Sequence, residues 1–274
     1  MELSSQLLLD TPALTVWDVV CAGTCRHQGE EEFAQTTSLV FPYRGVYVRH
    51  VGRNDAVAEA NQVLFFNQTE GYRVSHPVEG GDACLSLTVG ETWLRELAPA
   101  GELRDAPVVA FRRERLRIDA GTQALVALLR QRLQRRRAAT LEAETLVLTL
   151  LSRALGKRSS HAPRGSPGRR KLVDRAKLVL SSDLGRHWTL GDIATAVGGS
   201  PVYLTQMFQQ VEGLPLYRYQ LRLRLARALH LLGRYEDLSR LSLDLGFSSH
   251  SHFSAAFRKL YGQTPSEFRR SILS

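Results

Sequence analysis

The sequence predicts an α+β protein in which a β-rich domain precedes an all-helical domain. Three observations support this fold class. Short β-prone runs separated by Gly, Pro, Asn and Asp fill residues 13–97. Leucines at helical spacing follow over residues 122–137 and 141–155. The last third of the chain then repeats one helix-turn-helix pattern.

The β-prone runs of the N-terminal part are LTVWDVV, SLVFPYRGVYVRHV, QVLFFN, YRVSH and CLSLTV. Strands of this length and spacing favour a small barrel or sandwich. Several runs are apolar on both faces, so we expect the sheet to face another layer of structure. Four side chains are candidates for lining a pocket there, namely Arg44, Tyr47, Arg49 and Tyr72. Surface charge and core packing are the alternative role of these four.

Two amphipathic helices are expected to connect the β-rich part to the helical part. Residues 122–137 and 141–155 should form an antiparallel hairpin, with Thr140 capping the second helix. Such a hairpin either packs on the strands or pairs with a second chain. Residues 157–168 are rich in Gly, Ser, Pro and Arg without periodicity, which predicts a flexible linker.

The helix-turn-helix pattern occurs twice in the C-terminal part. The residues of the first copy are Ile193, Val197, Gly198, Leu204, Phe208 and Gly213, and they match Leu241, Leu245, Gly246, Phe253, Phe257 and Gly262. The offset is 48 residues before the turn and 49 after it, so the second turn should contain one extra residue. We expect Thr189 to start the first helix of the first pair, and Ser200 with Pro201 to start its recognition helix. Ser248 or Ser249 should cap the later recognition helix, and Thr264 should cap a closing helix.

Residues 169–274 closely resemble the DNA-binding domain of the AraC/XylS transcription regulators. The residues that carry the resemblance are Leu190, Ile193, Ala194, Gly198, Ser200, Leu204, Phe208, Gly213, Gly246, Phe247, Ser251, Phe253, Phe257, Gly262, Pro265 and Arg269. Residues 65–84, FFNQTEGYRVSHPVEGGDAC, are similar to the N-terminal half of a subset of these regulators. The resemblance implies a cupin-like β-barrel domain for effector binding and dimerisation over residues 1–156, the linker over 157–168, and a double helix-turn-helix domain over 169–274.

The charge distribution fits a DNA-binding role for the C-terminal domain. Residues 169–274 hold 16 Lys and Arg against 8 Asp and Glu, whereas residues 1–168 hold 20 against 19. A basic surplus confined to one domain suits a polyanion partner. Apolar runs stay short of the roughly 20 residues of a membrane helix, and MELSSQLLLD makes a poor signal peptide. We therefore expect a cytoplasmic, sequence-specific regulator that binds double-stranded DNA and no membrane. The resemblance also implies that the protein forms a homodimer, binds a small-molecule effector and contacts RNA polymerase.

The outward stripes of the two recognition helices predict how DNA is read. The residues expected to contact bases are Val202, Thr205, Gln206 and Gln209 on the first helix, and His250, Ser251, Ser254 and Ala255 on the second. The residues expected to contact phosphates are Ser200, Arg218, Arg222, Arg258 and Lys259. Gln206 has the geometry to bond adenine bidentately, while Val202 or Thr205 can meet a thymine methyl. Simple solvation is the alternative for Gln206. Because Ala255 has no donor, we expect the second helix to read sequence less sharply.

The three cysteines, Cys21, Cys25 and Cys84, indicate a reducing compartment because their number is small and odd. Together with His27 they offer a Cys3His zinc set, but packing as small buried hydrophobes is the expected role. The alternative function is a thiol- or metal-responsive switch that senses through these cysteines. A third reading is a DNA-repair enzyme of the alkyl-transfer type, which needs a reactive cysteine in a setting that the chain lacks. We expect no catalysis, no bound metal and no cofactor.

Overall fold

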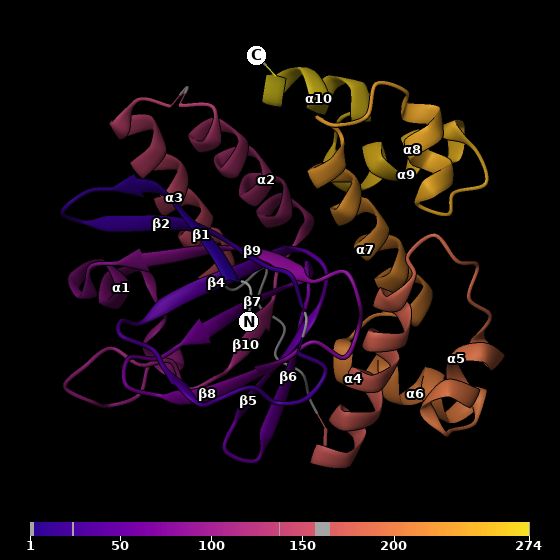
Figure 1. The fold of residues 1–274 in the computed structure, drawn as a ribbon, viewed down its shortest axis with the longest axis horizontal. Coiled ribbons are helices and arrows are strands. Elements are labelled where there is room, and N and C mark those ends of the chain that lie inside the picture. The colour runs from indigo at the N-terminus through magenta and orange to yellow at the C-terminus, as the bar shows by residue number, and fades with distance from the viewer. Residues whose placement is uncertain (1–2, 24, 137, 157–164, 274) are drawn as a thin grey trace. The chain divides into compact units, whose positions relative to one another are not determined.

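The computed structural model divides into two compact units, residues 1–162 and 163–274 (Figure 1). The residues that it describes are 3–23, 25–136, 138–156 and 165–273. Most of the predicted linker over residues 157–168 lies outside the described residues. Its last two residues belong to a helix that begins at Pro167.

The strands of the N-terminal unit form two antiparallel sheets. The larger sheet has the order β1 (Leu3–Asp10), β2 (Leu14–Cys21), β9 (Asp82–Val89), β4 (Ser38–Arg44), β7 (Gln62–Phe66) and β10 (Arg115–Arg117). The smaller sheet has the order β3 (Glu32–Phe33), β8 (Gly71–Ser75), β5 (Tyr47–Val51) and β6 (Asn54–Ala58). The mixed helix-and-sheet class is confirmed, but the cupin-like closed barrel is not. Over the described residues both sheets stay open, because the edge strands pair on one side only: these are β1 and β10 in the larger sheet, and β3 and β6 in the smaller one.

The central strands β4, β7 and β9 of the larger sheet are buried on both faces, as their doubly apolar sequences predicted. On β9, the side chains of Ala83, Leu85 and Leu87 belong to the main core, which they share with the helices of this unit. Cys84 lies between Ala83 and Leu85 on the same strand, and its side chain belongs to a smaller core that also holds residues of β5, β6 and β7. Because successive side chains of a strand point to opposite faces, the sheet separates a helical layer from the smaller sheet.

The helices of this unit are α1 (Glu91–Leu97), the short 3-10 turn η1 (Ala100–Glu102), α2 (Ala120–Gln134) and α3 (Thr140–Leu155). The helical hairpin α2–α3 packs on the larger sheet, which confirms one of the two roles expected for it. Asp18 of β2 anchors α2: its carboxylate lies 3.2 Å from Arg130 Nε and accepts from Gln134 (2.6 Å) and from the Tyr43 hydroxyl (2.6 Å). Thr140 is the first residue of α3 rather than its cap, since the chain turns helical one residue earlier than expected and Ala139 takes the cap position.

The C-terminal unit is all-helical, as predicted. Its helices are α4 (Pro167–Ser182), α5 (Leu190–Val197), α6 (Pro201–Glu212), α7 (Leu216–Leu231), α8 (Leu238–Asp244), α9 (His250–Tyr261) and α10 (Pro265–Leu273). Figure 1 shows α5 and α6 beside one end of α7, with α8 and α9 at the other. Phe208 of α6 packs edge-on against Tyr219 of α7, with ring centroids 5.2 Å apart. Beneath them the buried Lys177 ammonium of α4 lies 2.5 Å from the Glu212 carboxylate. The long helix α7 therefore carries one helix pair at each end.

Candidate functional site

The first helix-turn-helix motif consists of α5 and α6. The Thr189 hydroxyl accepts from the backbone N–H of Asp192 (3.1 Å), and the Asp192 carboxylate accepts from the Thr189 N–H (3.0 Å). Thr189, at which the sequence pattern started this helix, is thus its N-cap in a reciprocal capping box. The hydrogen bond from the Thr189 N–H lowers the pKa of Asp192. Gly198 then ends α5 in the left-handed conformation, with φ at 70°. Ser200 caps α6, so both helix ends that meet at the turn are fixed.

The second motif, α8 and α9, repeats this arrangement with a longer turn. Gly246 adopts φ of 75° after α8, and Ser249 caps α9 by accepting from the His252 N–H (3.1 Å). The sequence pattern did not distinguish Ser248 from Ser249 as the cap of this helix, and the structure shows that the cap is Ser249. It stands three residues after Gly246, whereas Ser200 stands two after Gly198. The extra residue predicted for the second turn is confirmed.

The outward faces of α6 and α9 carry the residues that the sequence pattern assigned to base reading. The exposed ones are Val202, Thr205, Gln206, Gln209, His250, Ser251 and Ala255, and Ser254 is half-buried. Thr205 donates its hydroxyl proton to the Pro201 carbonyl (2.9 Å), so it presents its methyl group and a lone pair. Ser254 Oγ lies 3.4 Å from His250 Nε2. The equivalent faces of the two helices therefore differ: α6 offers amide groups, and α9 offers short side chains.

The groups assigned to phosphate contact lie in different environments. Arg218, Arg258 and Lys259 are exposed, while Arg222 is half-buried. The Ser200 hydroxyl accepts from the Tyr203 N–H (3.2 Å) as the cap of α6. Its acceptor role is thereby used, but its proton remains available to a phosphate oxygen.

Sequence reasoning missed the structural role of Arg224 on α7. Its guanidinium donates to the carbonyls of Leu184 (2.7 Å) and Arg186 (2.8 Å), before the first motif, and of Gly246 (2.9 Å), in the turn of the second. Burial lowers the pKa of this guanidinium. A Cβ on Gly246 would meet Arg224 Nη2 at 2.7 Å, so the glycine also makes room for the arginine. One side chain therefore joins the two motifs. The four arginines crowded on α7 were the available signal, but spacing alone did not distinguish this one.

A pocket of about 390 Å³ lies between the two sheets of the N-terminal unit. Its apolar lining consists mainly of Trp17, Phe33, Val40, Phe66, Tyr72 and Val74, and its polar end holds Cys21, Tyr47, His76, Asp82 and Cys84. Of the four residues proposed from sequence, Tyr47 and Tyr72 line it. The two arginines do not: Arg49 donates to the Glu70 carboxylate (2.7 Å) and Arg44 to the Asp82 carbonyl (3.1 Å).

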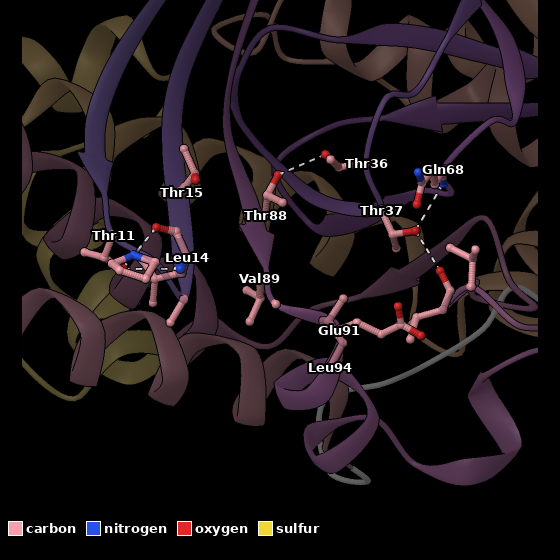
Figure 2. Close-up of a pocket in the computed structure, with 15 residues that line it drawn as sticks. Thr11, Leu14, Thr15, Thr36, Thr37, Gln68, Thr88, Val89, Glu91 and Leu94 are labelled. Atoms are coloured by element: carbon pink, nitrogen blue, oxygen red, sulfur yellow. Dashed lines mark hydrogen bonds between the residues drawn. The ribbon is translucent and has the colours of Figure 1, made fainter.

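A second pocket of about 280 Å³, rich in threonine hydroxyls, opens where β2, β4 and β9 meet the loops (Figure 2). Thr37 donates to the Val109 carbonyl (2.7 Å) and accepts from the Gln68 N–H (3.1 Å). Thr11 is bonded to the backbone of Leu14. These hydroxyls of the second pocket are therefore already bonded within the protein.

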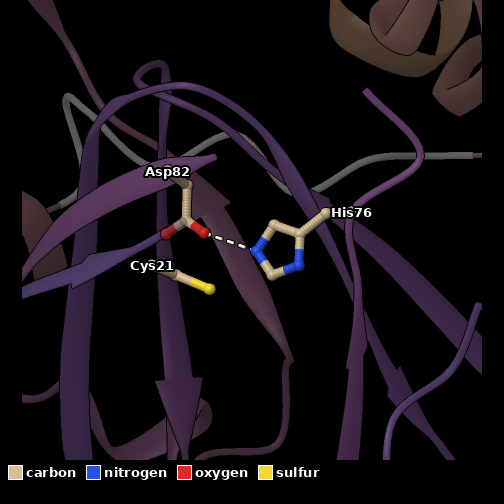
Figure 3. Close-up of side chains that lie close together, drawn as sticks. All are labelled: Cys21, His76 and Asp82. Atoms are coloured by element: carbon tan, nitrogen blue, oxygen red, sulfur yellow. Dashed lines mark hydrogen bonds and ion pairs between the residues drawn. The ribbon is translucent and has the colours of Figure 1, made fainter. Parts of the chain in front are cut away.

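The structure places Cys21 beside His76 and Asp82, not in the set with His27 that was considered from the sequence. Cys21, His76 and Asp82 are buried, and their potential ligand atoms all lie within 4.8 Å of one another (Figure 3). His27, part of the zinc set considered from sequence, is exposed instead. Burial raises the pKa of Cys21 and that of Cys84. A protonated thiol is a poor nucleophile, so the arrangement does not favour redox sensing.

The chain is similar to known transcription regulators. Residues 193–271 match a family model described as a helix-turn-helix domain. The chain is 30% identical to the probable transcriptional regulator LumQ of Photobacterium leiognathi, over 83% of this chain and 89% of LumQ. It is 30% identical to the Msm operon regulatory protein of Streptococcus mutans over 41% of each chain. It is also 35% identical to the transcriptional activator CfaD of Escherichia coli, over 35% of this chain and 36% of CfaD. The chain thus spans about two fifths or less of the length of these last two relatives.

Two helix-turn-helix motifs on one connecting helix, with these relatives, define a DNA-binding transcription regulator rather than an enzyme. The chain belongs to the AraC/XylS family. Among solved structures, an AraC-type regulator from Chromobacterium violaceum is 31% identical, covering 39% of this chain and 96% of its own, with a TM-score of 0.37. ToxT from Vibrio cholerae is 12% identical over 96% of this chain and 100% of its own, with a TM-score of 0.38. Among the described residues, no single helix is both long enough and apolar enough to cross a membrane.

Proposed function

We propose that this regulator places α6 and α9 in successive major grooves on one side of DNA and reads a different half-site with each helix. The observation that carries the proposal is the pair of exposed, equivalently placed helix faces joined by a single helix. The 16 residues of α7 extend about 24 Å at ~1.5 Å per residue. That length suits the roughly 34 Å between successive major-groove faces.

Base reading is assigned to the outward residues of both helices, with the larger share on α6. Gln206 is exposed and lacks a hydrogen-bond partner within the described part of the chain, so its amide can bond an adenine bidentately. Val202, at 68% exposure, offers an apolar contact to a thymine methyl. Arg218, Arg258 and Lys259 are assigned to phosphates, which position the protein without specifying sequence.

An effector is assigned to the pocket between the two sheets. Its volume, about 390 Å³, falls in the range of small-molecule sites, roughly 300–1,000 Å³. Aromatic side chains from both sheets, Trp17, Phe66 and Tyr72, favour a compact ligand with an apolar or aromatic body. We further propose that the regulator acts as a homodimer in contact with RNA polymerase. The outer side of α3, where Leu141 is 75% exposed, is the surface offered for pairing.

The test of the proposed function is DNA binding by the full chain and by residues 163–274 alone. Binding sites are selected from random duplexes, and affinity is then measured against salt concentration. Both proteins should bind the selected duplex, and log affinity should fall linearly with log salt because bound cations release counterions. A folded helical unit that binds all duplexes equally would contradict sequence-specific recognition. Absence of any salt-sensitive binding would contradict DNA binding altogether.

A further inference from the structure

We propose that Cys21, His76 and Asp82 form a binding site for one Zn²⁺ ion, with a fourth coordination position open to the pocket between the sheets. From sequence alone, packing was the expected role of the cysteines. The structure brings one of them to a histidine and a carboxylate more than 50 residues away in the chain.

The three donor groups converge from opposite sheets. Cys21, the last residue of β2, and Asp82, the first of β9, are direct partners in the β2–β9 register. His76 follows β8 of the smaller sheet and points across the gap toward them (Figure 3). Donor atoms of a tetrahedral zinc site lie about 3.3–3.8 Å apart, given bonds of ~2.0–2.3 Å. Atoms already within 4.8 Å of one another therefore need only small movements. The 2.6 Å contact between His76 Nε2 and Asp82 Oδ1 must open by roughly 0.7 Å to admit the ion.

The backbone around the cluster is tightly packed and holds these positions. Gly23, Gly45 and Gly81 all have positive φ. A Cβ on Gly81 would lie 2.1 Å from the Cys21 carbonyl oxygen, and one on Gly23 would lie 2.5 Å from Gly81 Cα. Only glycine permits this close approach of three chain segments. The backbone N–H of Gly23 also donates to Cys21 Sγ (3.4 Å), which fixes the position of the sulfur.

The orientation of His76 is set from its other side. His76 Nδ1 lies 3.1 Å from Cys25 Sγ, and the His76 backbone N–H donates to the Cys25 carbonyl (2.7 Å). This leaves Nε2 directed to the cluster. In a metal-bound histidine, the ring nitrogen that does not bind the metal usually makes a hydrogen bond to another group. Cys25 is therefore a positioning residue rather than a ligand.

The donor set selects the ion. One sulfur, one imidazole nitrogen and one carboxylate oxygen suit Zn²⁺, whereas Mg²⁺ and Ca²⁺ prefer oxygen ligands alone. Three protein ligands leave a tetrahedral ion with one free position. Cys21, His76 and Asp82 all line the 390 Å³ pocket, so that position faces the space in which a small molecule would lie.

The test uses the protein of residues 1–274, expressed in medium that contains zinc and then dialysed against metal-free buffer. Elemental analysis should find one zinc per chain. After chelation, titration with Co²⁺ should produce the d–d absorption of a tetrahedral site and a thiolate-to-cobalt charge-transfer band. Cys21→Ser should lose the charge-transfer band. Cys21→Ser, His76→Gln and Asp82→Asn should each weaken Zn²⁺ binding by at least about 100-fold, since changes to outer partners alone cost about 10–100-fold. Cys25→Ser should weaken binding by about 10-fold.

Two matched controls come from the set that sequence alone suggested. Cys84→Ser removes another buried thiol of the same pocket, and His27→Gln removes an exposed imidazole nearby in sequence. Both variants should keep one zinc per chain. Circular dichroism and DNA binding establish that each variant is folded. If Cys21→Ser fails to fold, the wild-type cobalt spectrum and Asp82→Asn decide the question. A folded wild-type chain that takes up neither Zn²⁺ nor Co²⁺ overturns the proposal, as does equal zinc loss in the controls.

Discussion

At the scale of single residues, the two recognition helices present different chemistry at equivalent positions. Gln206 of α6 corresponds to Ala255 of α9, and Thr205 to Ser254. A bidentate contact discriminates between bases by about 1–3 kcal/mol, whereas a single hydroxyl accepts several bases. The half-site under α6 should therefore be more sharply specified than the half-site under α9.

Gln206→Ala should relax base preference at one or two positions of the α6 half-site, because the amide that distinguishes adenine is lost. The measurement is affinity against a library of single-base variants of the selected duplex. Gln210→Ala is the matched control, since Gln210 is also an exposed amide of α6 but lies outside the proposed base-reading set. Unchanged preferences in Gln206→Ala would show that its amide is merely solvated.

Arg258→Ala should weaken binding to every duplex of the same library about equally, because a phosphate contact has no sequence information. The slope of log affinity against log salt should fall by roughly one unit. If Arg258→Ala changed the base preferences instead, the assignment of reading and anchoring residues would be reversed.

At the scale of elements, buried polar contacts hold helices to their neighbours. Both side chains of the Asp18–Arg130 pair, which joins β2 to α2, are only 5% exposed. Arg130 also stacks over the ring of Tyr43, with its guanidinium carbon 4.2 Å from the centroid. Removing one member of such a pair leaves a charge buried without its counterion.

Asp18→Ala should destabilise the N-terminal unit by about 3–5 kcal/mol, the usual cost of an unpaired buried charge. Denaturant unfolding followed through Trp17 and Trp93, which lie in this unit, reports the change. Arg95→Ala breaks the pair with Glu91 on α1, whose side chains are 46% and 49% exposed, and should cost no more than about 0.5 kcal/mol. Equal effects of the two variants would rule out a special role for the buried pair.

The capping box of α5 should make that helix acid-sensitive. The hydrogen bond from the Thr189 N–H holds the folded-state pKa of Asp192 below the usual value of an aspartate. A carboxylate with a depressed pKa stabilises the fold above its unfolded pKa, and this stabilisation is lost as the pH falls through the folded value. The protection of α5 amides from hydrogen exchange, relative to the intrinsic exchange rate at each pH, should therefore fall below about pH 4. Asp192→Asn should flatten this pH dependence, and an unaltered profile would contradict the assignment.

Local patterns predicted the elements that local chemistry determines. These predictions follow from residues a few positions apart: the turn glycines, the helix starts at Thr189 and Ser200, the Thr264 cap, and the extra residue of the second turn. The strand β1 was missed because LSSQLLLD shows no alternation and lies at a sheet edge. The strand β6 was missed because NDAVA begins with two polar residues.

The metal-ligand cluster could not be predicted in the same way. Cys21 meets Asp82 through strand pairing, and His76 arrives from the other sheet. Such proximity depends on sheet topology, which local periodicity does not specify. The stretch HPVEGGD, which places His76 and Asp82 within seven residues, was a partial signal, but it does not contain Cys21.

At the scale of the whole molecule, each unit has its own buried core. One core combines the larger sheet with α2 and α3, and another combines α4, α5 and α6 with the start of α7. Residues 163–274 alone should therefore show a cooperative thermal transition close to that of the same unit in the full chain. Trp188 fluorescence, the tryptophan signal of this unit, measures it. A non-cooperative melt would show that the helical unit depends on the N-terminal one.

The three hydrogen bonds that the Arg224 guanidinium donates to backbone carbonyls bear on the spacing of the DNA half-sites. Because they tie the turn of the second motif to the loop before the first, the folded unit sets the distance between its two reading helices. One base pair inserted between the half-sites moves them about 3.4 Å apart and rotates them by roughly 36°. With one half-site under each helix, as proposed, we expect target promoters to keep both half-sites in one helical phase. Operators with one to five inserted base pairs should lose affinity in the wild type, and Arg224→Met should reduce that penalty.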